Sequence, residues 1–187
     1  ICMLIMTIFA TNAIFAQKVR IVTNDVDVFT GTHIIETSKL KLEDISFSAR
    51  AVNNNIYFLI EWKNLDGSIS VEGLHPTIKL LLSNHEQVKI ESNYNLQAEK
   101  YIQEDGSYVS VYPGLGYTHN QQYYKTIITA VFHMSPNDIN YFTNKNNPIE
   151  VIQIDMGIGK YELNKRDLFY YSINLNKLFT VLLKEMK

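Results

Sequence analysis

The sequence predicts a mainly β fold: an antiparallel β-sandwich, or one strongly curled sheet, with a short crossover helix and a C-terminal amphipathic helix. Apolar and polar residues alternate with a period of two through most of the chain, as in strands with one buried face. Two segments are expected to be helical: one near residue 139, from its capping pattern, and one at the C-terminus, from its helical period. The lack of repeats and of a Pro/Gly/Ser-rich linker predicts one domain.

The first sixteen residues are predicted to be a secretory signal peptide. They contain no charged side chain, and the polar residue Gln17 follows Ala16. An apolar run of this length is typical of a signal peptide and is shorter than the run of about 20 residues that crosses a membrane as a helix. We therefore expect cleavage after Ala16, with Ala13 as second choice, and a single β-rich domain over 17–187 that is periplasmic or secreted. A buried N-terminal strand or helix is the alternative interpretation.

The cysteine content and the net charge exclude several classes of function. Cys2 is the only cysteine and lies within the predicted signal peptide, so the mature chain would have no disulfide, thiolate metal site or cysteine nucleophile. The formal net charge of −2 gives no electrostatic reason to expect nucleic acid or an anionic membrane as a partner. We expect no cofactor and no stable membrane span after cleavage.

The first predicted elements are two β-hairpins. Residues 45–52 and 56–63 alternate strongly, and three asparagines at 53–55 favour a tight turn between them. Residues 78–82 and 88–90 alternate in the same way around a polar turn. The polar face of each strand is expected to meet water. The later segment from residue 93 to 122 is less regular and is interpreted as a long loop with one embedded strand at 107–112.

The next elements are a long strand at 123–134, a short helix and a strand at 151–156. Ser135 can cap the helix, Pro136 suits its first position, and Asp138 can return a hydrogen bond to the cap. This pattern indicates a helix start directly after the long strand.

The C-terminal region predicts a hairpin and a helix. The hairpin is expected between 160–163 and 168–173, across a turn at 164–167. Asn174 is the expected N-cap of the helix. The apolar positions of the helix form one stripe at the helical period: Leu175, Leu178, Phe179, Leu182 and Met186.

This order of elements, with Ser135-Pro-Asn-Asp-Ile139 followed by Ile149-Glu-Val-Ile-Gln-Ile154, resembles a broad group of uncharacterised exported β-sandwich proteins from host-associated Gram-negative bacteria. The resemblance covers roughly residues 77–187 and concerns the order of elements. It implies the fold class and an exported location, and no activity.

Metal sites are not indicated by local spacing. No two of the five histidines stand at a ligand spacing of two or four residues. The segment Asp25-Val-Asp27 has too few oxygen ligands for calcium, so we interpret it as a polar entry segment before the first strand. The sequence therefore predicts no metal ligand.

Paired carboxylates would be the basis of a glycan- or peptidoglycan-directed hydrolase. Among the acidic residues, Glu61 stands out because Ile60 and Trp62 flank it. By alternation it shares a face with Tyr57 and Lys63, and Lys63 can neutralise it there, so we expect a surface residue. No Gly-x-Ser-x-Gly motif is present, and no catalytic residue is assigned.

A tyrosine-rich segment is the best candidate for ligand binding. Several tyrosines and amide side chains fall within 101–124, around Pro113-Gly-Leu-Gly116. Tyrosine combines a flat apolar ring with a polar tip, which suits a sugar ring or a protein partner. The competing interpretation is that these tyrosines pack on the sheet. The predicted ligand-binding residues, with one tryptophan as a secondary aromatic, are Tyr108, Tyr112, Tyr117, His119, Tyr123 and Trp62.

The function expected from these patterns is an exported, non-catalytic binding or interaction module of the bacterial envelope, with a glycan or another envelope protein as partner. Two alternatives stay open. One is a hydrolase that uses a carboxylate pair, and the other is a structural or inhibitor-like partner that docks by a sheet edge.

Overall fold

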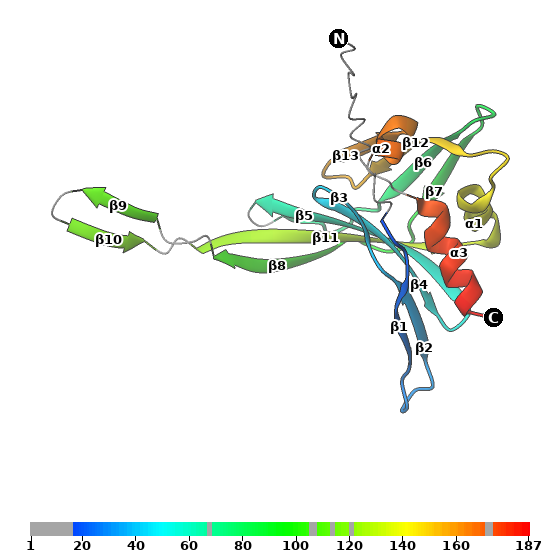
Figure 1. Cartoon of the computed structure of the whole chain (residues 1–187), viewed down its shortest axis with the longest axis horizontal. Coiled ribbons are helices and arrows are strands. Elements are labelled where there is room, and N and C mark those ends of the chain that lie inside the picture. Colours follow the sequence, from blue (N-terminus) through cyan, green and yellow to red (C-terminus); the bar gives the residue numbers. More distant parts are fainter. Residues whose placement is uncertain (1–16, 67–68, 105–107, 113–114, 120–121, 171–173) are drawn as a thin grey trace, which may run out of the picture.

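Over the residues that it describes, the computed structural model of the chain has two antiparallel sheets of seven and four strands, a separate two-stranded hairpin and three helices (Figure 1). The prediction of a mainly β, sandwich-like fold with a short helix and a C-terminal helix is confirmed. The structure describes residues 17–66, 69–104, 108–112, 115–119, 122–170 and 174–187. The predicted signal peptide lies outside these residues, so its cleavage stays a prediction. Within them, no helix is long and apolar enough to span a membrane.

The larger sheet has seven strands, in the order β1-β2-β4-β5-β11-β8 with β3 paired to β4. Its longest pairing joins β5 to β11, and both strands extend away from the helices toward a separate β9–β10 hairpin (Figure 1). The strands of this sheet are β1 (Ile21–Val26), β2 (His33–Thr37), β3 (Leu40–Leu42), β4 (Ile45–Val52), β5 (Asn55–Asp66), β8 (Gln97–Glu104) and β11 (Gln122–Met134).

The smaller sheet has four strands in the order β13-β12-β6-β7. The hairpin and the helices complete the fold. The remaining elements are β6 (Thr77–Leu82), β7 (Gln87–Glu91), β9 (Tyr108–Tyr112), β10 (Leu115–His119), β12 (Ile149–Asp155), β13 (Lys160–Asn164), α1 (Pro136–Thr143), α2 (Lys165–Tyr170) and α3 (Leu175–Glu185).

Both predicted hairpins in the first half are confirmed. β4 pairs with β5 through the register Ile45↔Trp62 to Val52↔Asn55, and Asn53 adopts a positive φ of 53° in the turn. β6 pairs with β7 in the same antiparallel manner. The alternation places Phe47 and Phe58 in the core with 0% and 1% of their surface exposed.

One core joins the two sheets to α1 and α3. Phe58 of β5 lies 5.4 Å from Phe142 of α1 and 5.6 Å from Phe179 of α3, between ring centroids. The two helical rings lie 5.0 Å apart. The apolar stripe of α3, which the helical period predicted, therefore packs onto the larger sheet.

The start of α1 has the predicted capping box. The Ser135 hydroxyl accepts a hydrogen bond from the Asp138 N–H at 3.2 Å, and the Asp138 carboxylate accepts one from the Ser135 N–H at 2.9 Å. These bonds satisfy two donors that a helix start otherwise leaves unpaired. The chain can therefore turn from the end of β11 directly into a helix.

Replacing Ser135 with alanine is expected to lower the free energy of unfolding by about 0.5–2 kcal/mol, because the Asp138 N–H loses its acceptor. Urea denaturation followed by circular dichroism measures the change. Ser70→Ala, at an exposed position outside helices and strands, is the matched control. Equal midpoints for the two variants would contradict the role of the cap.

The predicted hairpin partner at 168–173 is wrong over the described residues, because Lys165–Tyr170 forms the helix α2. The Asn164 side chain accepts from the Asp167 N–H at 3.0 Å, and the Asp167 carboxylate accepts from the Asn164 N–H at 3.1 Å. The polar residues interpreted as a turn therefore begin a helix. The first strand of that hairpin is confirmed as β13.

Two further expectations are corrected. The long loop from residue 93 to 122 instead contains β8, β9 and β10, and the strand expected at 107–112 is β9, as far as it is described. β8 has polar residues at successive positions, so its alternation is weak, and it forms by pairing with β11. Asp25 lies within β1 rather than before the first strand. Strands β1 to β3 were not predicted.

Candidate functional site

The outer face of the larger sheet, opposite the core, contains a groove. The groove has a volume of about 570 Å³ and is lined by side chains from β4, β5, β8 and β11, together with Lys39 and Tyr94. Its central strand is β5, where the outward residues Tyr57, Leu59 and Glu61 alternate with the core residues. The strand alternation that fills the core therefore also gives the groove its surface.

The strand register arranges the groove in rows across the sheet. One row contains Arg50, Tyr57 and His133. The next row contains Ser48, Leu59 and Val131, and a third brings Ser46, Glu61 and Thr129 together. Two of the three side chains in the middle row, Leu59 and Val131, are thus apolar, while aromatic and polar groups lie on either side.

The middle row forms an apolar floor. Leu59 is only 7% exposed although it points away from the core. Ile127 and Val131 of β11 line the same groove and are half-buried. Ser46 and Ser48, also on this face, are nearly buried at 4% and 3% exposed. Leu59 and the two serines are therefore shielded from water, whereas Ile127 and Val131 stay partly accessible in the groove.

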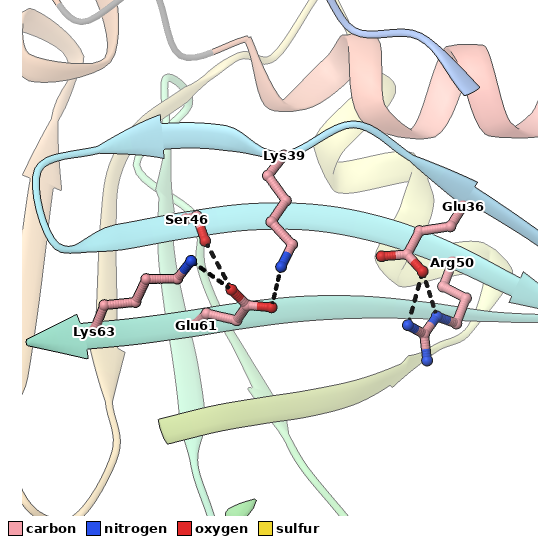
Figure 2. Close-up of polar contacts among 6 residues, drawn as sticks. All are labelled: Glu36, Lys39, Ser46, Arg50, Glu61 and Lys63. Carbon is pink, nitrogen blue, oxygen red and sulfur yellow. Dashed lines mark hydrogen bonds and ion pairs between the residues drawn. The ribbon is translucent and has the colours of Figure 1, made fainter. Parts of the chain in front are cut away.

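Glu61 is the centre of a charged group beside the floor (Figure 2). Its Oε1 lies 2.5 Å from Lys39 Nζ, and its Oε2 lies 3.6 Å from Lys63 Nζ. The Ser46 hydroxyl donates to Oε2 at 3.3 Å. The predicted pairing with Lys63 is confirmed, but Lys39 is the closer partner and was not predicted.

These contacts set the protonation of Glu61. Burial alone raises the pKa of the carboxyl, but the hydrogen bond from Lys39 and the charges of Lys39 and Lys63 outweigh it, so the pKa lies below its usual value. The side chain is 16% exposed. Glu61 is therefore an ionised, half-buried carboxylate rather than a freely solvated surface residue.

A second ion pair stands further along the groove (Figure 2). Arg50 Nη2 and Nε donate to Glu36 Oε2 at 2.7 Å and 2.9 Å. The guanidinium lines the groove while Glu36 belongs to β2. The ion pair links β4 to β2 and fixes the position of the Arg50 guanidinium.

An aromatic group stands in the same row as Arg50. The Tyr57 ring lies 6.1 Å from Tyr94 and 5.5 Å from His133, between centroids. The hydrogen bond between the two tyrosines raises the pKa of Tyr57, and burial adds to the effect. Ser92 positions Tyr94 by donating to the Val131 carbonyl at 2.5 Å and accepting from the Tyr94 N–H at 2.9 Å.

The described lining of this groove includes none of the predicted ligand-binding residues. The backbone places Tyr108 and Tyr112 in β9, Tyr117 and His119 in β10, and Tyr123 in β11, with His119 opposite Tyr108. The positions of these five side chains lie outside the described part of the chain. The hairpin stands beyond the far ends of β8 and β11 (Figure 1).

Trp62 points into the space between the sheets rather than into the groove. Its ring lies 6.5 Å from Tyr161 of β13, between centroids. A Cβ at Gly159 would lie only 2.7 Å from Trp62 Cη2, so the glycine gives the indole its room. The structure thus gives Trp62 a packing role, and its role in ligand binding stays a prediction.

The groove residues Arg50, Tyr94 and Lys39 were missed because they lie on different strands or connections. The sequence offered one indication of the groove: the alternation along the strand placed Glu61, Tyr57 and Lys63 on one face.

Among the described residues, no group of three or more His, Cys, Asp or Glu side chains could hold a metal ion. A scan of protein-family models and searches of curated proteins and solved structures found no match to this chain.

The ionised state of Glu61 predicts a pH-dependent contribution to stability. Because the folded pKa is lowered, the contribution is fully present above the unfolded pKa and is lost as the pH falls through the folded value. Glu61→Gln is expected to cost about 1 kcal/mol at neutral pH, and the difference from wild type should disappear in acid.

Urea denaturation of wild type and Glu61→Gln at a series of pH values measures the difference in their free energy of unfolding. Glu150→Gln is the matched control, because that carboxylate is more exposed, at 35%, and lies 3.8 Å from Lys165. It should cost less than Glu61→Gln at neutral pH. A cost for Glu61→Gln that persists unchanged in acid would contradict the electrostatic explanation.

Proposed function

We propose that this chain is an exported, non-catalytic binding module of the cell envelope, and that it binds its ligand in the groove on the outer sheet face. The observation that carries the proposal is the groove itself. It combines an apolar floor at Leu59 and Val131 with positioned polar groups and an aromatic pair. Such a combination of apolar lining and few fixed polar groups is typical of ligand sites.

The aromatic and amide groups favour a glycan as the first ligand to test. Tyr57 and Tyr94 offer ring faces and edges, and Gln97 and Thr129 offer hydrogen-bonding groups in the same groove. A protein partner is the other outcome. Apart from Lys39 and Tyr94, the groups that line the groove come from paired strands, which supports a preformed site.

A glycan array with three proteins tests the proposal and separates the two aromatic candidates. Tyr57→Ala should lose most of the binding signal if the groove is the site. Tyr117→Ala, in the β9–β10 hairpin, is the matched control and should retain it. Loss in Tyr117→Ala alone would move the site to the hairpin, and no signal from wild type would remove the glycan from consideration.

A hydrolase is the second candidate, because Glu61 and Glu99 both line the groove. A glycoside hydrolase needs one carboxyl that stays protonated as the acid. The lowered pKa of Glu61 suits a base or nucleophile and not this acid, so Glu99, on the same groove, is the carboxylate to replace in a test. Release of reducing sugar from a bound glycan by wild type, and its loss in Glu99→Gln, would favour the hydrolase.

Docking by a sheet edge receives less support. The register of β1, at one edge, is interrupted between Ile21 and Thr23, and the Asp25 carboxylate accepts the Val26 N–H at 2.9 Å. Bulges and edge charges are devices that discourage strand addition.

The exported location rests on residues 1–16 and has its own test. N-terminal sequencing of the protein from its native cells should find Gln17 first. A mature protein that retains residues 1–16 would contradict the location.

A further inference from the structure

The segment before β1 is attached to the connection between β2 and β3. Val19 lies in the core with 9% of its surface exposed. Ser38, in that connection, donates through its N–H to the Arg20 carbonyl at 2.7 Å and through its hydroxyl to the Lys18 carbonyl at 3.2 Å. The same hydroxyl accepts from the Arg20 N–H at 3.1 Å. Residues 18–20 are therefore held against the larger sheet.

Gln17 extends this attachment with its side chain. Its Nε2 donates to the Lys41 carbonyl at 2.7 Å, and its Oε1 accepts from the Lys41 N–H at 2.7 Å. Lys41 is the middle residue of β3, which pairs with β4. In an antiparallel sheet, two opposite residues exchange the same pair of bonds through their backbones. The half-buried Gln17 amide thus takes the place of a strand residue beside β3.

Cleavage after Ala16 would make Gln17 the first residue of the mature chain, and an N-terminal glutamine has its own chemistry. Its α-amino nitrogen can attack the side-chain Cδ and close a five-membered lactam, pyroglutamate. The Cδ–Nε2 bond breaks, and Nε2 takes up the proton that the amine loses and leaves as ammonia. The reaction needs no oxidant, reductant or second reactant. It uses the unprotonated amine, whose pKa in model peptides is about 7.7–8.0.

This cyclisation removes an atom that the attachment uses. Nε2 is the donor to the Lys41 carbonyl, and it departs as ammonia. Oε1, which accepts from the Lys41 N–H, becomes the ring carbonyl oxygen and is drawn back toward the backbone of Gln17. To react, the side chain must therefore leave β3. The folded protein opposes the reaction for as long as the two bonds persist.

We propose that Gln17 is a modification site under the control of the fold: β3 keeps this N-terminal glutamine uncyclised, and it becomes pyroglutamate when the segment detaches. The inference rests on the proposed export and on cleavage after Ala16. One hydrogen bond typically shifts an equilibrium by about twofold to tenfold, so the two bonds should slow cyclisation about fivefold to a hundredfold. Cyclisation would also remove the charge of the terminal amine.

Intact-mass spectrometry of the mature chain over time tests the inference. The chain is released from an N-terminal fusion by a protease that cuts directly before Gln17, and it is kept near pH 8, about the pKa of a terminal amine. Each cyclisation lowers the mass by one ammonia. A peptide of residues 17–26 gives the rate without the fold. The folded chain should react about fivefold to a hundredfold more slowly than this peptide.

Two variants of one residue separate the backbone contact from other effects of the fold. Lys41→Pro removes the N–H that Gln17 accepts, at a strand that pairs only with β4 among the described strands, and it should speed cyclisation. Lys41→Ala is the matched control, because it keeps both backbone groups and should react as wild type does. Ser38→Ala, which loosens residues 18–20 and leaves β3 intact, should also speed the reaction. Circular dichroism confirms that each variant is folded.

The outcomes distinguish this inference from the proposed export. Equal rates for the folded chain and the peptide, or for folded Lys41→Pro and Lys41→Ala, would reject control by β3. Mature protein from native cells that is largely pyroglutamate at Gln17 would reject it too, although such a product would still support export and cleavage after Ala16. Native protein that retains residues 1–16 would reject export and, with it, the modification, whatever the rates of the prepared chain.

Discussion

Replacing Phe58 with alanine is expected to lower the free energy of unfolding by about 3–5 kcal/mol. Phe58 is 1% exposed and its ring contacts Phe47 of β4, Phe142 of α1 and Phe179 of α3. Its removal leaves a cavity where a sheet and two helices meet. Paired strands on one side and two helices on the other limit how far this cavity can collapse.

Urea denaturation of wild type and Phe58→Ala measures this loss of unfolding free energy. The expected loss is a large part of the total stability of most single domains. Phe169→Ala is the matched control, since the same residue type is 74% exposed on α2. Its cost should stay within about 0.5 kcal/mol. A cost below about 1.5 kcal/mol for Phe58→Ala would show that the helices are not packed on the sheet as described.

The position of Phe58 could be predicted from the sequence, and its partners could not. Alternation along β5 is enough to place Phe58 and Ile60 on one face and Glu61 on the other. The neighbours of Phe58 come from α1 and α3, more than eighty residues further along the chain. Local periodicity has no information about which distant helix covers which face.

The missed elements share a physical cause. β8 has polar residues on both faces and exists through its pairing with β11. α2 has the polar start that a turn also shows, and only the reciprocal bonds of Asn164 and Asp167 distinguish the two. Where the local signal is weak or ambiguous, long-range pairing or a cap decides the structure.

The candidate groove, too, depends partly on local alternation and partly on long-range strand pairing. Its floor residue Leu59 and its carboxylate Glu61 lie on a face that the alternation defines. The placement of its other lining residues depends on the register, which brings Arg50 beside Tyr57 and Thr129 beside Glu61. The predicted tyrosine-rich segment had the stronger compositional signal, but composition does not show which aromatic rings share a surface.

Replacing Gly159 with alanine is expected to destabilise the protein by about 1–3 kcal/mol, the usual cost of overpacking. A Cβ there would lie 2.7 Å from Trp62 Cη2 and 2.9 Å from Cζ3. The indole is also held by Tyr161, so it has little freedom to move. Gly159 accepts the Met156 N–H at 3.0 Å, which fixes the turn between β12 and β13 against the ring.

The sign of this change makes it informative. Where no contact intervenes, replacing glycine by alanine at an ordinary φ stabilises a protein by about 0.4–1 kcal/mol, because the unfolded chain loses entropy. Urea denaturation of Gly159→Ala in the wild-type and Trp62→Leu backgrounds separates the two effects. Gly159→Ala should lower the free energy of unfolding only in the background that keeps the indole. In the Trp62→Leu background, the smaller leucine side chain should make Gly159→Ala neutral or stabilising. An equal cost in both backgrounds would contradict the contact, and with it the packing role of Trp62 between the two sheets.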